Sequence, residues 1–137
     1  MNLMIDTNIF IDVLTERQPF FTTSKEVLSL CLDKKVQGFL SASSVTDIFY
    51  LIYRRFHSNE IAYEKLGYIL DIVKVLSVTN EDVLNAYVKK SSDFEDCLLA
   101  TCAISNGCHG IVTRNKKDFE SFGITLFSPE EMIALFE

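Results

Sequence analysis

Short segments with an apolar centre recur along the chain, and each is followed by a polar or amphipathic stretch. The first segment, at residues 2–5, is an apolar run that stops at Asp6. Comparable segments lie at 35–40, 73–78, 110–113 and 124–127. Apolar segments this short are typical of strands that are buried on both faces of a sheet. The pattern therefore predicts five short strands.

The stretches between these segments have the periodicity of helices. The clearest is at 45–56, where apolar residues are spaced by three and four positions and Ser43 or Ser44 can cap the start. Further helices are expected at 8–15, 22–34, 60–72, 81–89 and 94–105. Gly107 follows the last of these in the position of a C-cap, and Ser128 with Pro129 opens a final helix.

Strands that alternate with helices form βαβ units, in which a parallel sheet is covered on both faces. We therefore expect one three-layer α/β/α domain over residues 1–137, with a central parallel sheet of about five strands. No segment approaches the roughly 18–20 apolar residues that a membrane span needs, and the N-terminus does not have the form of a signal peptide. A cytoplasmic protein is expected, without membrane association.

The four cysteines and two histidines do not form a zinc-binding pattern. Cys31, Cys97, Cys102 and Cys108 contain no C-x-x-C pair, and each lies in an apolar context. In a cytosolic chain this favours free, buried thiols. The chemistry of the protein is more plausibly found among its acids.

Four acidic residues follow predicted strands or open the helices that come after them. They are Asp6, Asp47, Asp96 and Asp118. In open parallel sheets, ligands bind beyond the carboxyl ends of the strands. Other polar residues accompany the acids in this region, namely Thr7, Asn8, Asp93, Thr113 and Asn115. We expect the whole group to gather at one edge of the sheet.

Most of these acids also have an ordinary structural interpretation. Asp6 can cap the helix after it, and Asp47 completes a capping box with Ser44. Ser92 and Glu95 can form a second capping box. Asp93 can favour the helix N-terminus through the dipole, and Asp118 can be a solvated acid in a basic loop.

Asp96 is the acid least easily explained in this way. It opens a helix that is apolar almost all round, where a buried carboxylate is costly unless a cation or hydrogen-bond donors meet it. Four converging acids repel one another unless something positive neutralises them. With oxygen ligands and almost no histidine, that cation is expected to be Mg2+ or Mn2+. Divalent ions held in this way commonly catalyse the hydrolysis of phosphodiester bonds.

The net charge of −6 is unusual for a protein that binds nucleic acid. Removing the four candidate acids takes the net charge from −6 to −2, so most of the excess lies in the proposed site. Arg114, Lys116 and Lys117 flank that site and are the candidate RNA-binding bases. Because no extended basic stripe exists, we expect weak intrinsic RNA affinity or help from a partner.

These motifs together resemble the PIN domain family. The resemblance rests on DTN after the first strand, the acid that opens the third helix, the DFED start of a buried helix and the TRN-x-x-DF loop. It covers essentially the whole chain, which looks most like the small VapC-like ribonuclease toxins of type II toxin–antitoxin modules. The resemblance implies a five-stranded parallel sheet, Mg2+- or Mn2+-dependent endoribonuclease activity and a cognate antitoxin.

The resemblance also assigns roles to individual residues. Asp6, Asp96 and Asp118 match the family's first, third and final acids and are the expected metal ligands. Asp47 stands where the family more often has Glu, one methylene longer, so it is a catalytic candidate whose direct contact with metal is in doubt. Thr113 and Asn115 match supporting polar positions.

Two other functions and the oligomeric state stay open on the sequence. One alternative is a PIN-like RNA-binding or RNA-processing scaffold whose cleavage is weak or vestigial. Another is a phosphotransfer domain, which the absence of D-x-D after the first strand disfavours. Aromatic residues on two helices suggest either a homodimer interface or ordinary core packing. They are Phe49, Tyr50, Tyr53, Phe56, Tyr63 and Tyr68.

Overall fold

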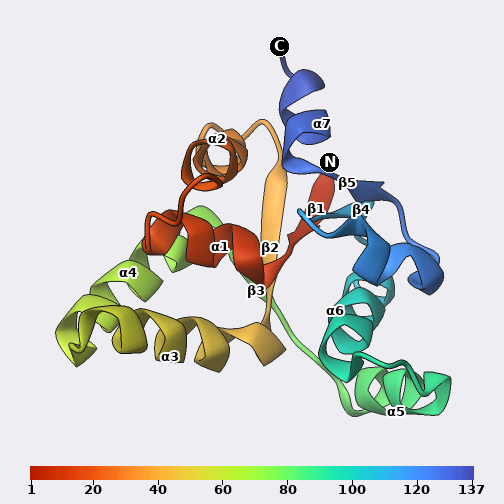
Figure 1. The fold of residues 1–137 in the computed structure, drawn as a ribbon. Coiled ribbons are helices and arrows are strands. Elements are labelled where there is room, and N and C mark those ends of the chain that lie inside the picture. Colours follow the sequence, from red (N-terminus) through yellow and green to blue (C-terminus); the bar gives the residue numbers. More distant parts are fainter.

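A computed structural model describes residues 1–137, and its centre is a five-stranded parallel sheet. The strands lie in the order β3-β2-β1-β4-β5 (Figure 1). Their bounds are β1 Asn2–Ile5, β2 Gln37–Ser41, β3 Lys74–Leu76, β4 Gly110–Val112 and β5 Leu126–Phe127. The predicted parallel sheet and its five strands are therefore confirmed.

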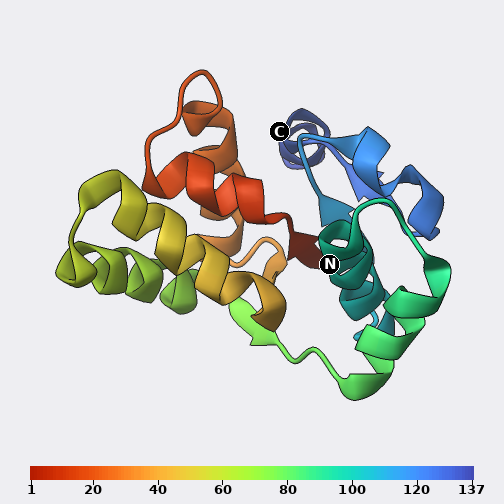
Figure 2. The ribbon, with the colours of Figure 1, turned by 60° about the horizontal axis from the view of Figure 1, so that its bottom comes forward.

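Helices cover both faces of the sheet. They are α1 Thr7–Leu14, α2 Phe21–Leu32, α3 Val45–Phe56, α4 Asn59–Ile72, α5 Asn80–Lys89, α6 Phe94–Ser105 and α7 Pro129–Ala134. Two short 3-10 helices, η1 Ala42–Ser44 and η2 Lys116–Phe122, follow β2 and β4. In Figures 1 and 2, α1 to α4 lie on one side of the sheet and α5 and α6 lie on the other.

The two faces of the sheet carry separate apolar clusters because successive side chains of a strand point to opposite faces. From β1, Leu3 and Ile5 join the larger cluster, which packs under α1 to α4 and α7. Met4 points the other way, into the smaller cluster under α6 and η2. From β4, Val112 and Ile111 divide in the same manner.

Most element boundaries agree with the sequence pattern to within a few residues. The helix predicted at 94–105 is Phe94–Ser105, and Gly107 beyond it has the positive φ of 72° expected of a C-cap glycine. The final helix begins as predicted, with Ser128 accepting from the Glu131 amide and Pro129 in the first turn. The two edge strands, β3 and β5, are shorter than the predicted segments.

Two predicted helix caps are wrong. The Ser44 side chain makes no capping hydrogen bond, because a 3-10 turn precedes α3 and the Ser41 hydroxyl caps that turn by accepting from the Ser43 amide. At α6 the cap is Asp93, whose carboxylate accepts from the Asp96 amide 3.0 Å away. Neither predicted capping box therefore explains the acids beside it.

The cysteines are free thiols, as predicted, with Cys31, Cys97 and Cys102 buried and Cys108 partly buried. Burial raises the pKa of both Cys31 and Cys108 to about 11. Thiols with such pKa values stay protonated at neutral pH and pack as small apolar groups. None of the helices combines the length and the apolar character needed to span a bilayer.

Candidate active site

The carboxyl ends of β1 and β4 lie at the point where the strand order reverses direction. The chain places β2 on one side of β1 and β4 on the other, and crevices at such switch points are the usual ligand sites of open α/β sheets. Asp6 follows β1 here, and its amide donates to the Val112 carbonyl of β4 at 3.0 Å. Thr113 follows β4, so the two side chains are neighbours.

A hydrogen-bond chain fixes the Asp6 carboxylate. The Thr113 hydroxyl donates to Asp6 Oδ2 at 2.9 Å, and the Asn115 amide donates to the same hydroxyl oxygen at 3.0 Å. Asp6 is only 5% exposed, and Thr113 is fully buried. Although Asp6 occupies the N-cap position of α1, its side chain makes no capping hydrogen bond. The helix-cap interpretation of Asp6 therefore fails.

Three of the four predicted acids line one hollow at this edge. The hollow has a volume of about 280 Å³. Its lining consists of Asp6, Thr7, Asn8, Asp47, Tyr50, Leu51, Glu95, Asp96 and Leu99. The polar members come from the first turns of α1, α3 and α6, so three helix N-termini meet here. Their partial positive charge offsets part of the repulsion among the carboxylates.

Burial and neighbouring negative charges raise the pKa values of acids at this site. Burial raises the pKa of Asp6 above its usual range, and the Thr113 hydrogen bond only partly opposes that rise. Burial also raises the pKa of Asp96 to about 7, with the charge of Asp93 adding to the effect. The charge of Asp118 contributes to the raised pKa of both Asp6 and Asp96. Asp118 therefore lies near the hollow without lining it.

Asp96 is less buried than the sequence suggests. It lies in the first turn of α6 and is partly exposed, whereas the fully buried part of that helix begins at Cys97. The expectation of a deeply buried carboxylate is corrected accordingly. The apolar residues that follow Asp96 in the sequence lie in the later turns of α6, whereas Glu95 and Asp96 in its first turn line the hollow.

Glu95 is a site residue that the sequence reasoning missed. It was assigned to a capping box, but it lines the hollow beside Asp96 and makes no capping hydrogen bond. Burial raises its pKa, and the nearby charge of Asp47 adds to the rise. The signal in the sequence was the DFED segment itself, which offers two adjacent acids after the capping Asp93.

The carboxylates of the hollow have no cationic partner in the chain. All three ion pairs lie elsewhere: Asp12 with Arg17 and Arg114, and Glu131 with Lys116. No three acidic, histidine or cysteine side chains stand in a metal-ligating arrangement. The chemistry of the donors nevertheless fits a hard divalent cation, because every candidate ligand is an oxygen and none of the carboxylates is ion-paired.

Two of the three predicted RNA-binding bases are engaged within the protein. Arg114 Nε and Nη2 donate to the two oxygens of Asp12 at 2.8 and 3.1 Å, and its guanidinium lies 3.7 Å from the Phe20 ring centroid. Lys116 Nζ donates to Glu131 Oε1 at 2.7 Å. Only Lys117 is exposed without such a partner.

Asp12 is a buried acid near the site that the sequence pattern did not indicate. It is fully buried in α1, and it also accepts a hydrogen bond from the Ser24 hydroxyl at 2.9 Å. Through Arg114 it ties α1 to the loop after β4, the same loop whose Thr113 holds Asp6. Its apolar neighbours in the sequence gave no sign of a partner 102 positions away.

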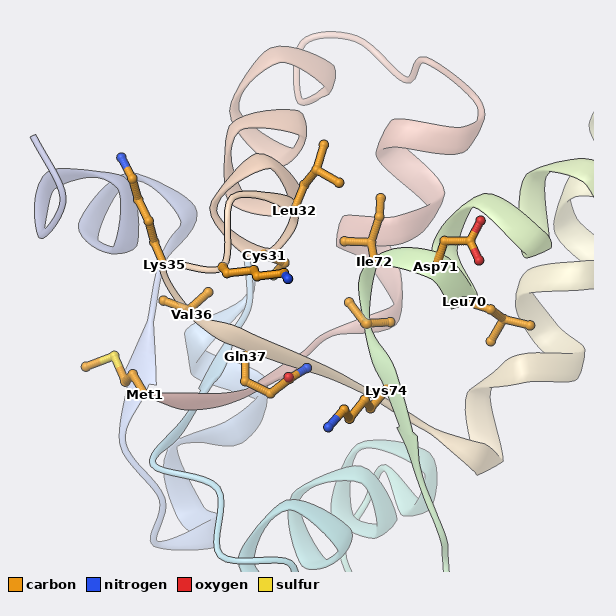
Figure 3. Close-up of a pocket in the computed structure, with 12 residues that line it drawn as sticks. Met1, Cys31, Leu32, Lys35, Val36, Gln37, Leu70, Asp71, Ile72 and Lys74 are labelled. Carbon is orange, nitrogen blue, oxygen red and sulfur yellow. The ribbon is translucent and has the colours of Figure 1, made fainter.

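A larger hollow, of about 670 Å³, lies at the opposite edge of the sheet. It is bordered by the ends of α2 and α4 and by the amino ends of β2 and β3 (Figure 3). Lys35 and Asp71 stand on opposite sides of it in that view. Lysines after helix C-termini and on an edge strand such as β3 have ordinary structural roles. None of the candidate acids borders this hollow.

The model of the PIN domain matches residues 2–117, so the chain belongs to the PIN domain family. This confirms the resemblance drawn from the sequence motifs. The match covers the region from β1 to the beginning of η2 and contains Asp6, Asp47, Asp96 and the start of the TRN-x-x-DF loop. No curated protein sequence matches the chain.

Solved structures share the fold at low sequence identity. VapBC2 of Rickettsia felis, bound to a DNA fragment from its promoter, is similar with a TM-score of 0.70 and 19% identity over 93% of this chain and 98% of that one. VapC20 of Mycobacterium tuberculosis, described as a sarcin-ricin loop cleaving toxin, has a TM-score of 0.69 and 17% identity over 90% and 96%. A toxin–antitoxin complex from Klebsiella pneumoniae has a TM-score of 0.66 and 18% identity over 93% of this chain and 97% of that one.

Proposed function

We propose that the protein is a metal-dependent endoribonuclease and the toxin of a type II toxin–antitoxin pair. One observation carries the nuclease proposal: the carboxylates of Asp6, Asp47, Glu95 and Asp96 line one hollow at the switch point of the sheet, and none of them forms an ion pair within the chain. A cluster of this kind is stable at neutral pH only with protons or a metal ion present.

Asp6, Asp96 and Asp118 are the residues proposed to hold the ion, Mg2+ or Mn2+, with Asp47 completing the ligand set directly or through water. When bound, such an ion stabilises charge on the phosphoryl oxygens and makes a bound water more acidic. Glu95 joins this group on the evidence of its position. The Thr113 hydroxyl holds the Asp6 carboxylate in one orientation, so this ligand is already positioned before substrate binds.

The first turn of α1 supplies donors for the substrate. Thr7 and Asn8 line the hollow, and the free backbone N–H groups of a helix N-terminus favour phosphate. We propose that these groups orient the scissile phosphate beside the acids. In-line attack of water then leaves a 3′-hydroxyl and a 5′-phosphate, as the family resemblance implies.

RNA as substrate and an antitoxin as partner are supported by the likeness to the toxin structures named above. Lys117 is the one exposed base of the TRN-x-x-DF loop that is free to contact phosphate. The weak basic character of the surface agrees with modest intrinsic RNA affinity. A short neighbouring reading frame for a DNA-binding protein would support the toxin proposal.

The Asp6→Asn variant tests the nuclease proposal. We expect cleavage of total RNA in the presence of Mn2+ to fall by about a hundred-fold or more, because a neutral amide is a poor ligand for the cation. Asp71→Asn is the matched control, since Asp71 is an exposed acid at the opposite edge of the sheet. Cleavage that persists in Asp6→Asn, with folding verified by circular dichroism, would refute the mechanism.

Metal binding gives an independent test. Isothermal titration with Mn2+ should show binding to the wild-type protein and weaker binding to Asp96→Ala. Equal binding by the two proteins would remove Asp96 from the ligand set, and no binding by either would exclude the metal-dependent mechanism.

A catalytically weak scaffold is the second candidate, and two observations favour it. No three acidic side chains stand in a ligating arrangement, and two of the three loop bases are engaged within the chain. A scaffold would bind RNA in a gel-shift assay and leave it intact with Mn2+ present. Mapped cleavage ends that depend on Asp6 would rule it out.

A further inference from the structure

Tyr50 is the one aromatic ring that lines the carboxylate hollow, and it is largely open to solvent. Its residue is 59% exposed. The other apolar lining residues differ: Leu99 is buried, and Leu51 packs against the larger apolar cluster. The apolar surface that the hollow presents to a ligand is therefore mainly the ring of Tyr50.

The ring of Tyr50 lies outside the aromatic and cation–π pairs of the protein. Three of the other four tyrosines each contact a ring or a cation: Tyr53 with His57, Tyr63 with Phe49, and Tyr87 with Lys90. Tyr50 is in no such pair, and its hydroxyl makes no hydrogen bond in the chain. A residue that is 59% exposed and outside every such pair gains less from packing than a buried one, and its ring is open to a ligand.

Its position on α3 places Tyr50 beside the acids. Asp47 and Tyr50 are three residues apart on the helix, and residues at this spacing are neighbours on one face. Both line the hollow, on the face opposite the apolar stripe that packs on the core. A phosphodiester held at the acids therefore brings one of its flanking nucleosides near the Tyr50 ring.

The charge of the protein limits how a nucleic acid can be bound at this edge. The net charge is −6, and Arg114 and Lys116 are held by Asp12 and Glu131. Phosphate contacts, which supply most of the affinity in basic proteins, are therefore few here. Stacking of a base on an aromatic ring needs no positive charge and contributes substantially to the binding of single strands.

We propose that Tyr50 stacks on an unpaired nucleobase next to the scissile phosphate and is a substrate-positioning residue of this site. The proposal rests on the nuclease function proposed above. A base within a duplex is already stacked and paired, and it must be unstacked at a cost before it can reach the ring. Duplex RNA therefore loses the contact that a single strand gains.

Cleavage kinetics of Tyr50 variants test the proposal. The substrate is a synthetic RNA oligomer that spans a cleavage site mapped in total RNA, used as a single strand and annealed to its complement. We expect Tyr50→Ala to lower kcat/KM on the single strand roughly ten-fold, the loss expected for one stacked base. The loss should lie mainly in KM, and the preference for the single strand over the duplex should shrink.

Two further variants separate stacking from other causes. Tyr50→Phe keeps the ring and should retain the wild-type kcat/KM, because the hydroxyl makes no hydrogen bond. Tyr68→Ala is the matched control: Tyr68 is 46% exposed and also lies outside every ring pair, but it lines a different hollow, between α1, α2 and α4. It should cleave both substrates as the wild type does.

Abasic scanning identifies the stacked base directly. Single abasic sites are placed along the oligomer, and binding is measured by fluorescence anisotropy with Asp96→Asn protein, which is expected to bind without cutting. One abasic position should weaken binding to this protein and have no effect once Tyr50→Ala is added. If every abasic position acts equally with and without the Tyr50 ring, the stacking proposal is wrong.

Other outcomes overturn the proposal in distinguishable ways. If Tyr50→Ala changes the oligomeric state in multi-angle light scattering and leaves kcat/KM intact, Tyr50 belongs to a contact between copies of the chain. If the wild type cleaves single strand and duplex equally, the nuclease proposal stands and the stacking proposal fails. If no RNA is cut at all, both fail.

Discussion

Loss of the Arg114 side chain should destabilise the protein strongly, although a loop arginine beside an active site would ordinarily be assigned to substrate binding. Arg114 donates two hydrogen bonds to a carboxylate, Asp12, that is fully buried in α1. The Arg114→Ala variant removes both donors and leaves Asp12 in place. Its remaining partners are the Ser24 hydroxyl at 2.9 Å and Arg17 at 3.7 Å.

The magnitude follows from the burial of the carboxylate. Removing one partner of a buried ion pair costs about 3–5 kcal/mol, because the other charge is left without compensation. The Arg114 side chain is 17% exposed, and Arg17 can move closer to Asp12. We therefore expect the lower end of this range, about 3 kcal/mol in the free energy of unfolding.

Urea denaturation of the metal-free protein measures the effect, with the slope m checked for equality among the variants. Lys116→Ala is the matched control on the same loop. Its ion pair with Glu131 is exposed on both sides, with side chains 40% and 52% accessible, so its loss should cost far less stability than the loss of Arg114. Replacing both buried charges, as Asp12→Leu with Arg114→Met, should recover much of the lost stability.

A small effect would refute this reasoning. If Arg114→Ala costs no more than Lys116→Ala, the ion pair with Asp12 does not hold the loop. If the variant keeps its stability and loses RNA binding, Arg114 contacts phosphate, as the sequence alone suggested.

Two further predictions concern stability. Because the folded-state pKa of Asp96 is about 7 against an ordinary 3.8, the metal-free protein should lose stability as pH rises from about 4 to 8, and Asp96→Asn should remove most of that loss. A pKa shift of this size corresponds to about 4 kcal/mol in the free energy of unfolding, and because solvent screens this partly exposed group we expect about 1–2 kcal/mol. Urea denaturation in the presence of a chelator measures the change, and a stability that does not vary with pH would contradict the prediction. Gly38→Ala places a Cβ 2.6 Å from Cys31 Sγ and should lower the free energy of unfolding by about 1–3 kcal/mol. The Cβ of Gly67→Ala, in α4, meets nothing within 4 Å, so this change should raise the free energy of unfolding by about 0.5–1 kcal/mol. The same urea denaturation assay measures both changes in stability. Equal effects of the two substitutions would show that the close contact with Cys31 does not destabilise Gly38→Ala.

The sequence determined the elements and their order because the signals for these are local. Apolar runs of three to five residues and helical periodicity depend on neighbours within a turn or a strand. The helix at Phe94–Ser105 and its C-cap Gly107 were predicted for this reason. The same local signals placed Asp6 and Asp118 after strands, and the alternation of elements implied a parallel sheet.

The tertiary structure decided which side chains meet. The sequence put Asp47 and Asp96 near Asp6 only through a general rule about strand ends, and it assigned Glu95 to a helix cap that Asp93 provides instead. The partner of Arg114, 102 residues earlier in the chain, was invisible to any local pattern.

Contacts between distant residues depend on how whole elements pack, and no residue's immediate neighbours encode that packing. The acids of the candidate active site were therefore predicted from the sequence only as a set of candidates. Three features follow from the packing of α1, α3 and α6 around the carboxyl ends of β1 and β4: the shared hollow, the hydrogen bond between Asp6 and Thr113, and the ion pair between Arg114 and Asp12.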